Sequence, residues 1–306
     1  MAVAEAADSD FDGAEVESFD EQGHVLVRRA GMRAEVRLNR PEKLNALDVH
    51  TVIGIKKAFD ALGEDDAVKV IIFRGEGRAF STGGDVGTLG VQYGRSSTQR
   101  YRLRFEETLP RGAFEAILYS PKIVIGEGKN YVLGVAVDLF SACDITICSQ
   151  GTVFGYPPAR MISATGVNSV FWILRLGLAL YSELCIMGRF FDADEALKHG
   201  LVNRVVPLSE LGATVSAAAD AVCAMPADGL YINKFNKKVA LDTLGVSANA
   251  LQSAMGHAMQ VNQKVGPDEW NLVKARADGG VRGAIATRDA PFREANLRYD
   301  PDGPAI

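Results

Sequence analysis

A single acidic residue lies in an otherwise apolar segment of this 306-residue chain and is a candidate for acid–base chemistry. Asp138 lies within 134–143, a short helical pattern with apolar residues on both sides. Burial in such a segment disfavours the charged carboxylate and raises its pKa, as a general base requires. The alternative is a structural role, in which Asp138 pairs with an arginine or a backbone group.

Two further stretches of the sequence bear on chemistry. The segment 75–90 is rich in glycine and contains the pair Gly83 and Gly84. Because glycine lets a backbone approach a ligand closely, this loop is a candidate for binding through its N–H groups, although taken alone it would be an ordinary turn. After Asp138, the stretch 151–182 contains no Asp and no Glu, so it offers no second carboxylate.

The elements around these residues alternate between strands and helices, which favours an α/β core with parallel pairing. Asp48 is a candidate N-cap for a helix that Gly63 stops, and the helical pattern 97–119 is interrupted near Pro110. From residue 168 onward the pattern is mostly helical. The strands are expected at 24–29 and 34–38, which form a hairpin, and at 68–73, 122–125, 144–148 and 201–206.

Charge is unevenly distributed along the chain. The net charge is −5, yet 1–22 holds eight acids and no Lys or Arg, which leaves 30 acidic against 33 basic residues in the remainder. An acidic, alanine-rich segment cannot bury enough apolar surface to offset its ordering entropy, so we expect 1–22 to be a disordered tail. A partner-binding arm is the minority alternative. The mildly basic remainder suits a polyanionic small ligand.

Composition excludes several classes of function. Hydrophobic residues make up 47% of the chain, but no apolar run is long enough to cross a bilayer, and no secretory signal is recognised. No basic stripe with interleaved aromatics indicates nucleic-acid binding. The four histidines match no metal spacing. A cytoplasmic protein with reduced thiols is expected, because no CxxC spacing connects its cysteines, Cys143, Cys148, Cys185 and Cys223.

Four segments, in the same order along the chain, resemble the enoyl-CoA hydratase/isomerase (crotonase) superfamily. They are an opening motif at 37–47 (RLNRPEKLNAL), an oxyanion loop at 77–86 (GRAFSTGGDV), a second oxyanion segment at 133–139 (LGVAVDL) with 142–145 (ACDI), and a later segment within 188–202 (GRFFDA, EA and GLV). Around Asp138 the sequence is most similar to the dienoyl-CoA isomerase branch.

This resemblance implies a crotonase fold, a spiral of stacked ββα units followed by a helical region. It divides the chain into a core at 23–207, which binds the acyl-CoA and holds the active site, and a helical region at 208–306. In the family that helical region packs on neighbouring subunits, so homotrimers or hexamers, dimers of trimers, are implied. Coenzyme A is expected as part of the thioester substrate, and no permanently bound cofactor is implied.

The resemblance also implies roles for individual residues. Two backbone N–H groups aimed at the thioester oxygen stabilise its developing charge, and here they map to Gly84 and Val135. Val135 replaces the usual glycine and brings a side chain close to the thioester, and Asn130 likewise stands where the family has glycine. Asp138 occupies the first catalytic carboxylate position, facing the α- and β-carbons of the substrate. Asp144 is expected to be structural.

The walls of the acyl-CoA groove map to two short segments. Lys43 is a candidate for a CoA phosphate, with a solvated surface lysine as the alternative. A solvated face is also preferred over nucleotide binding for the lysines at 234, 237 and 238. The residues of the two walls are Lys43, Leu44 and Ala46 on one side and Thr82, Asp85 and Val86 on the other.

The second catalytic carboxylate of the family is missing. The corresponding residue is Pro158, and the positions used by other branches hold Ala164 and Gly166, none of which can transfer a proton. Three substitutes were considered, each with a structural alternative. Tyr156 is a candidate proton donor or core residue, Arg160 a ligand for a substrate carboxylate or a salt-bridge partner, and Glu127 an acid in an apolar strand.

The sequence therefore predicts an acyl-CoA enzyme of this superfamily, a lyase or isomerase, that works through an oxyanion-stabilised enolate. Isomerisation is favoured over hydration, because hydration normally uses two carboxylates to activate one water, whereas a 1,3-proton shift needs in principle one base. The alternatives are a decarboxylase or carbon–carbon hydrolase of the same superfamily and a non-catalytic acyl-CoA-binding protein.

Overall fold

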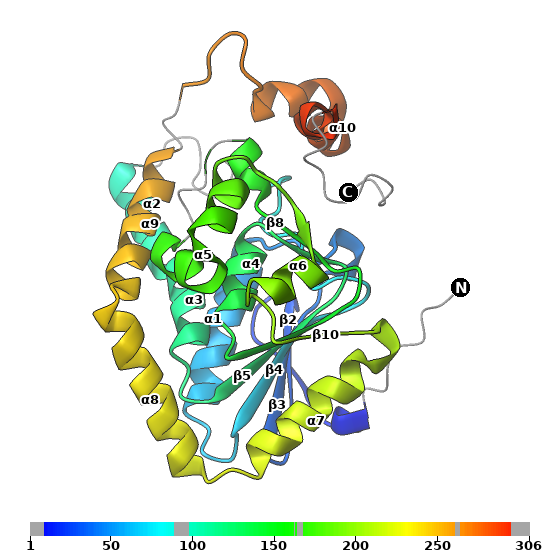
Figure 1. Cartoon of the computed structure of the whole chain (residues 1–306), viewed down its shortest axis with the longest axis vertical. Coiled ribbons are helices and arrows are strands. Elements are labelled where there is room, and N and C mark those ends of the chain that lie inside the picture. The colour runs from blue at the N-terminus through cyan, green and yellow to red at the C-terminus, as the bar shows by residue number, and fades with distance from the viewer. Residues whose placement is uncertain (1–8, 89–97, 162, 164–167, 261–263, 295–306) are drawn as a thin grey trace.

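The computed structural model describes residues 9–88, 98–161, 163, 168–260 and 264–294 (Figure 1). Its centre is a seven-stranded sheet in which β1, β2 and β3 pair antiparallel and every later neighbour pairs parallel. In spatial order the strands are β1 (Val16–Ser18), β2 (Val25–Ala30), β3 (Arg33–Leu38), β4 (Val70–Gly75), β5 (Ile123–Gly128), β7 (Ile145–Ser149) and β10 (Arg204–Val206).

A second, three-stranded sheet was not predicted from the sequence. It contains β6 (Tyr131–Leu133), β8 (Val153–Gly155) and β9 (Phe191–Asp192). These strands have only two or three residues each, which is too short for an alternating pattern to stand out. Their role is positional, because β6 leads through Gly134 into the helix that carries Asp138.

Helices cover both faces of the large sheet (Figure 1). The aromatic-rich main core lies on the face of α1, α3, α4 and α5, and α7 covers the other face. The helices are α1 (Val49–Gly63), α2 (Gln99–Thr108), α3 (Pro110–Leu118), α4 (Val135–Ser141), α5 (Ser169–Cys185), α6 (Ala193–Lys198), α7 (Leu211–Cys223), α8 (Ala227–Thr243), α9 (Val246–Gln260) and α10 (Leu272–Glu294), with 3-10 turns η1 (Ser9–Phe11), η2 (Pro41–Lys43), η3 (Pro157–Arg160) and η4 (Leu208–Glu210).

Most local predictions are confirmed. The hairpin is β2–β3, and α1 has Asp48 as its N-cap, whose carboxylate accepts a hydrogen bond from the Thr51 N–H at 2.9 Å. The interrupted helical pattern is two helices, because Pro110 begins α3 directly after α2. All four cysteines carry free thiols. None of the described helices is long and apolar enough to cross a membrane.

The prediction of a disordered tail is wrong for residues 9–22. The strand β1 pairs with β2, and Phe11 is buried against the sheet under Arg28. The acids of this segment find partners there, since Asp10 pairs with Arg33 at 2.7 Å. Composition alone could not reveal that the segment is ordered, because Arg28 and Arg33 belong to β2 and β3, which come later in the chain. Residues 1–8 lie outside the described part.

The predicted boundary at residue 207 does not separate the core from the helical region that follows it. The helix α7 buries Leu211, Val215 and Ala219 against strands β4, β5 and β7. The next helix, α8, is fixed to the sheet by Asp144, whose carboxylate accepts hydrogen bonds from the Val124 N–H at 2.8 Å and from Lys234 Nζ at 2.7 Å. Lys237 pairs with the same carboxylate, so Asp144 is structural and neither lysine is a solvated surface group.

Replacing Asp144 by asparagine is expected to lower the free energy of unfolding by about 3 kcal/mol at pH 7, because Lys234 keeps a buried charge without a counter-ion. Burial lowers the pKa of Lys234 to about 8, so the deficit should shrink between pH 7 and pH 9 as the folded state comes to hold neutral lysine. Urea denaturation at both pH values measures this. Asp60→Asn, which breaks an exposed pair with Lys56, is the control and should cost under about 0.5 kcal/mol.

Candidate active site

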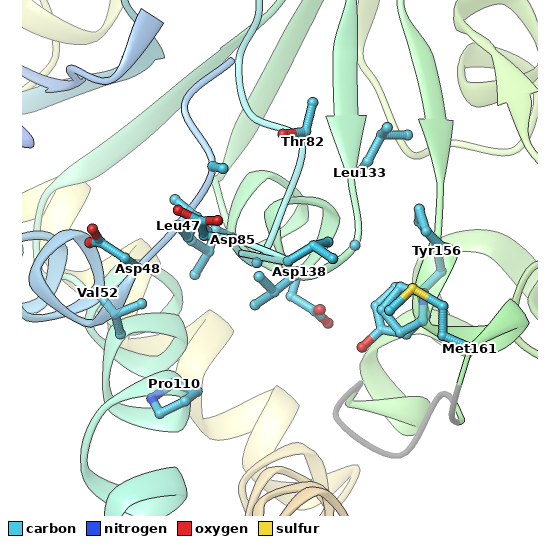
Figure 2. A pocket seen from close by; sticks show the side chains of 18 of the residues that line it. Leu47, Asp48, Val52, Thr82, Asp85, Pro110, Leu133, Asp138, Tyr156 and Met161 are labelled. Carbon is cyan, nitrogen blue, oxygen red and sulfur yellow. The ribbon is translucent and has the colours of Figure 1, made fainter. Parts of the chain in front are cut away.

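A cavity of about 990 Å³ opens beside the N-terminal end of α4 (Figure 2). Its walls come from distant parts of the chain: the segments 42–49 and 82–87, the helices α2, α3 and α4, the turn η3, and the helices α9 and α10. A cavity of this size can enclose a drug-sized ligand. The helical region beyond residue 207 therefore contributes directly to the site.

Backbone pairing brings the Gly83–Gly84 loop alongside the start of α4. Ser81 bridges Val132 in parallel, and the Leu133 N–H donates to the Ser81 carbonyl at 3.1 Å. Gly84 and Val135 follow these paired residues on the two segments, and both line the cavity. Contact continues along the loop, because a Cβ on Gly83 would stand 2.4 Å from the Leu133 carbonyl oxygen, a closeness that only glycine permits.

The N–H groups of Gly84 and Val135 are both available to a ligand. Val135 is the first residue of α4, so its N–H has no intrahelical acceptor. No backbone hydrogen bond among the described residues uses either group. Both residues line the cavity. Two neighbouring donors at a helix N-terminus form a site for a developing negative charge.

Asp138 is buried on the first turn of α4 and lines the same cavity. It is 4% exposed, and one carboxylate oxygen, Oδ1, accepts a hydrogen bond from Trp172 Nε1 at 2.7 Å. The other oxygen, Oδ2, has no hydrogen-bond partner among the described residues. Burial raises the pKa of Asp138 well above its usual value, and the Trp172 hydrogen bond partly opposes this. A raised pKa and an oxygen without a hydrogen-bond partner among the described residues are properties that suit a general base.

Replacing Trp172 by phenylalanine tests this arrangement. The tryptophan hydrogen bond stabilises the carboxylate, so its loss should raise the pKa of Asp138 further. If the carboxylate is the active form, the acidic limb of the pH profile of kcat/KM should move to higher pH by about one unit, with a smaller change at the plateau. An unmoved limb would mean that Asp138 does not control the rate.

Tyr156 faces Asp138 across the cavity, on the side of η3 (Figure 2). Its ring packs edge-on against Trp172, with centroids 5.4 Å apart. Burial, and then the charge of Asp138, raises the pKa of Tyr156 well above its usual value. The phenol therefore stays protonated and can act only as a neutral hydrogen-bonding group.

All six residues predicted for the acyl-CoA groove line this cavity: Lys43, Leu44, Ala46, Thr82, Asp85 and Val86. Lys43 is half exposed at the rim, with its Nζ 3.5 Å from Asp85. The Asp85 carboxylate is committed to the loop, because it accepts hydrogen bonds from buried Arg40 at 3.1 Å and from the Gly87 N–H at 2.9 Å. Asp85 thus shapes the wall rather than offering a free charge.

Two predicted substitutes lie outside the cavity. Arg160 points away from it, because its guanidinium pairs with Asp289 at 3.0 Å and donates to the Gly188 carbonyl at 2.6 Å. It also stacks between Phe190 and Phe292, so the proposed contact with a substrate carboxylate is wrong. Glu127 is buried and pairs with Arg74 at 3.5 Å, away from the cavity lining.

The position of the missing second acid is informative. Pro158 does line the cavity, so a carboxylate there would have faced the ligand. Ala164 and Gly166 lie outside the described residues. Asn130, another departure, has φ +51°, a left-handed conformation that asparagine tolerates better than most residues and that glycine would adopt freely.

Sequence reasoning missed several ionisable residues that the structure brings to the cavity, among them Glu106 of α2 and His257 of α9. Glu106 sits beside Glu107 on a helix with several arginines, and no sequence signal separates the two acids. The packing of α9 against α2 buries Glu106 and leaves Glu107 exposed. Among the described residues, no three His, Cys, Asp or Glu side chains are grouped as a metal site.

The cavity combines a buried carboxylate, two N–H groups without a backbone partner and a rim that carries Lys43, an arrangement that can stabilise a developing negative charge next to a proton acceptor. Comparison with known proteins specifies the class of protein. The model of the enoyl-CoA hydratase/isomerase family matches residues 29–265, and this chain belongs to that family.

Individual relatives agree with this assignment. A short-chain-enoyl-CoA hydratase of Clostridium acetobutylicum is 28% identical over 204 residues, covering 66% of this chain and 76% of the relative. A peroxisomal Delta(3,5)-Delta(2,4)-dienoyl-CoA isomerase of Arabidopsis thaliana is 32% identical over 193 residues, covering 60% and 69%. A crystal structure of enoyl-CoA hydratase from Mycobacterium smegmatis superposes with a TM-score of 0.76, covering 92% and 96% at 22% identity, which confirms the predicted crotonase fold.

Proposed function

We propose that this protein shifts a carbon–carbon double bond in an acyl-CoA thioester through an enolate intermediate. The observation that carries the proposal is Asp138, a buried carboxylate with one free oxygen beside the N–H groups of Gly84 and Val135. The proline at 158, in a wall position where an acid would face the ligand, favours isomerisation over hydration. The match to a dienoyl-CoA isomerase supports the same choice.

In the proposed reaction the Asp138 carboxylate removes a proton from the α-carbon of a β,γ-unsaturated thioester. The electron pair of that C–H bond moves into a dienolate, and the charge on the thioester oxygen is stabilised by Gly84 and Val135. Protonation of the γ-carbon then gives the α,β-unsaturated product. One carboxyl group can in principle perform both transfers, so the reaction does not require an acid at Pro158.

We propose that the CoA moiety lies along the wall formed by 43–46 and 82–86, with its phosphates near the basic rim of the cavity. Three cationic side chains support this placement, Lys43, Arg78 and Arg282, all of which are exposed and line the cavity. Exposed cations at a cavity mouth attract polyanionic ligands and speed their association.

We also propose that the helices beyond residue 207 assemble the protein into homotrimers or hexamers. The support is an apolar surface on α8 that the chain itself leaves uncovered, and analytical ultracentrifugation tests it. Four side chains that are half or more exposed make up this surface, Tyr231, Ile232, Phe235 and Val239. Exposed apolar patches of this kind mark interaction surfaces.

Product analysis in deuterated water tests the proposed reaction. The panel contains enoyl-, dienoyl-, β-keto- and malonyl-type CoA thioesters, analysed by mass spectrometry. Deuterium uptake with a shifted double bond and no added water is the expected result. Gain of water would assign the protein to hydration, as the names of relatives such as the Clostridium enzyme suggest. Loss of CO2, or a cleaved product, would identify a decarboxylase or hydrolase, and binding without any turnover a non-catalytic protein.

A further inference from the structure

A further carboxylate that lines the cavity, Glu106, is buried to an unusual degree for a helix surface. Glu106 is 2% exposed, although its neighbour Glu107 is 56% exposed and forms a surface pair with Arg111. One oxygen of Glu106, Oε2, lies 2.8 Å from His257 Nδ1, a close contact without hydrogen-bond geometry, since Nδ1 has no hydrogen-bond partner among the described residues. The other, Oε1, has no hydrogen-bond partner within the part of the chain that the structure describes.

A purely structural role explains this arrangement poorly. An ion pair that fastened α2 to α9 would be expected to satisfy both oxygens, because a buried carboxylate oxygen without a partner costs free energy. The unsatisfied atom belongs to a residue that lines the substrate cavity. Buried ionisable groups with unmet hydrogen bonds in a cavity are concentrated at functional sites.

Glu106 and Asp138 approach the cavity from different helices. Pro110, one turn beyond Glu106, lies across the cavity from Met161, and Asp138 stands between them in Figure 2. Both carboxylates influence the same phenol, because burial first, and then the charge of Asp138 and more weakly that of Glu106, raise the pKa of Tyr156. Both acids line one cavity, so each can contact a different part of a single bound acyl chain.

Building on the proposed function, we propose that Glu106, in contact with His257, is a second proton-transfer residue, which protonates the γ-carbon after Asp138 has taken the α-proton. The substrate class is a β,γ-unsaturated acyl-CoA. As the dienolate collapses, its electron pair forms the new γ-C–H bond with the proton of the Glu106 carboxyl. Asp138 ends protonated and Glu106 ionised. Proton exchange with water then returns Asp138 to the carboxylate and Glu106 to the acid. His257 gives access to water, because its side chain is 28% exposed.

This division of labour separates two measurable events. Removal and return of the α-proton by Asp138 exchanges that position with solvent, whereas the double-bond shift requires γ-protonation as well. The experiment follows both by NMR and mass spectrometry in deuterated water with 3-butenoyl-, 3-hexenoyl- and 3-decenoyl-CoA. The variants are Glu106→Gln, Asp138→Asn and, as the matched control on the same helix, Glu107→Gln, whose side chain lies outside the cavity lining.

In Glu106→Gln we expect the double-bond shift to fall about 100-fold while α-exchange stays within about threefold of wild type. Asp138→Asn should lose both reactions, and Glu107→Gln should lose neither. A structural defect in Glu106→Gln would lower both reactions together and would show in its melting temperature and CoA binding. An unchanged ratio of shift to exchange in Glu106→Gln would overturn the role of Glu106 alone. A wild-type protein that carries out neither reaction would overturn the proposed function, and this inference with it.

Discussion

Replacing Asp138 by asparagine should lower kcat by about 10³-fold while leaving the affinity for an unreactive CoA thioester within about threefold. Asparagine has nearly the same shape, so it can still accept the hydrogen bond from Trp172, but it cannot take a proton. The oxyanion donors and the proposed CoA wall are untouched by the change. The expected loss therefore falls on the chemical step rather than on binding.

The same substitution should not destabilise the fold. Burial raises the pKa of Asp138 above its unfolded value, so the carboxylate's contribution to stability falls as pH rises from about 4 through the folded pKa. A neutral asparagine escapes that cost, and the melting temperature of Asp138→Asn should equal or exceed that of wild type at pH 8. Such a gain in stability with loss of activity is typical of functional residues.

Turnover in the product assay, binding by isothermal titration calorimetry and melting by calorimetry check these expectations. Asp66→Asn, an exposed acid away from the cavity, is the control and should change none of them. Retained turnover in Asp138→Asn would exclude this residue as the base. A lower melting temperature at pH 8 would instead mean that the carboxylate is stabilised in the fold.

The second large effect is expected for Gly83→Ala, which should lower kcat/KM by about 100-fold. Gly83 has φ +83°, and an added Cβ would stand 2.4 Å from the Leu133 carbonyl oxygen and 3.3 Å from the Gly134 Cα. The obstructing atoms belong to backbone, so the loop must move away from β6. That movement is expected to displace the Gly84 N–H relative to the Val135 N–H.

Gly31→Ala separates backbone strain from displacement of the loop. Gly31 also has a left-handed φ of +58°, but a Cβ there would meet nothing within 4 Å. Both variants should lose about 1 kcal/mol of stability from the strained conformation. Gly83→Ala should lose more, because its Cβ also meets backbone atoms, and only Gly83→Ala should lose activity. Kinetics on the best substrate of the panel, together with urea denaturation, make the comparison. Equal activity in the two variants would show that the loop position is not critical.

The packing of distant segments decided several features that residue patterns could not predict. The sequence predicts that Arg160 faces the ligand, but its guanidinium pairs with Asp289 of α10 and packs on two aromatic rings outside the cavity. Glu106 resembles any acid on a charged helix until α9 covers it. The acidic segment 9–22 is ordered because Phe11 and Asp10 meet partners on the sheet. In each case the partner lies far along the chain, and its position depends on the complete fold.

Local sequence by itself determined the α/β class, the β2–β3 hairpin and the Asp48 cap of α1, because turn chemistry, capping and apolar periodicity act over a few neighbouring residues. The order of the four motifs indicated the family. The sequence also identified Gly84, Val135 and Asp138 as candidates, since ordered motifs carry them. Only the tertiary structure decided which of the candidates share a cavity and which additional acid joins them. Burial and charge pairing, which control the pKa and availability of a carboxylate, arise from contacts between segments that the linear sequence keeps apart.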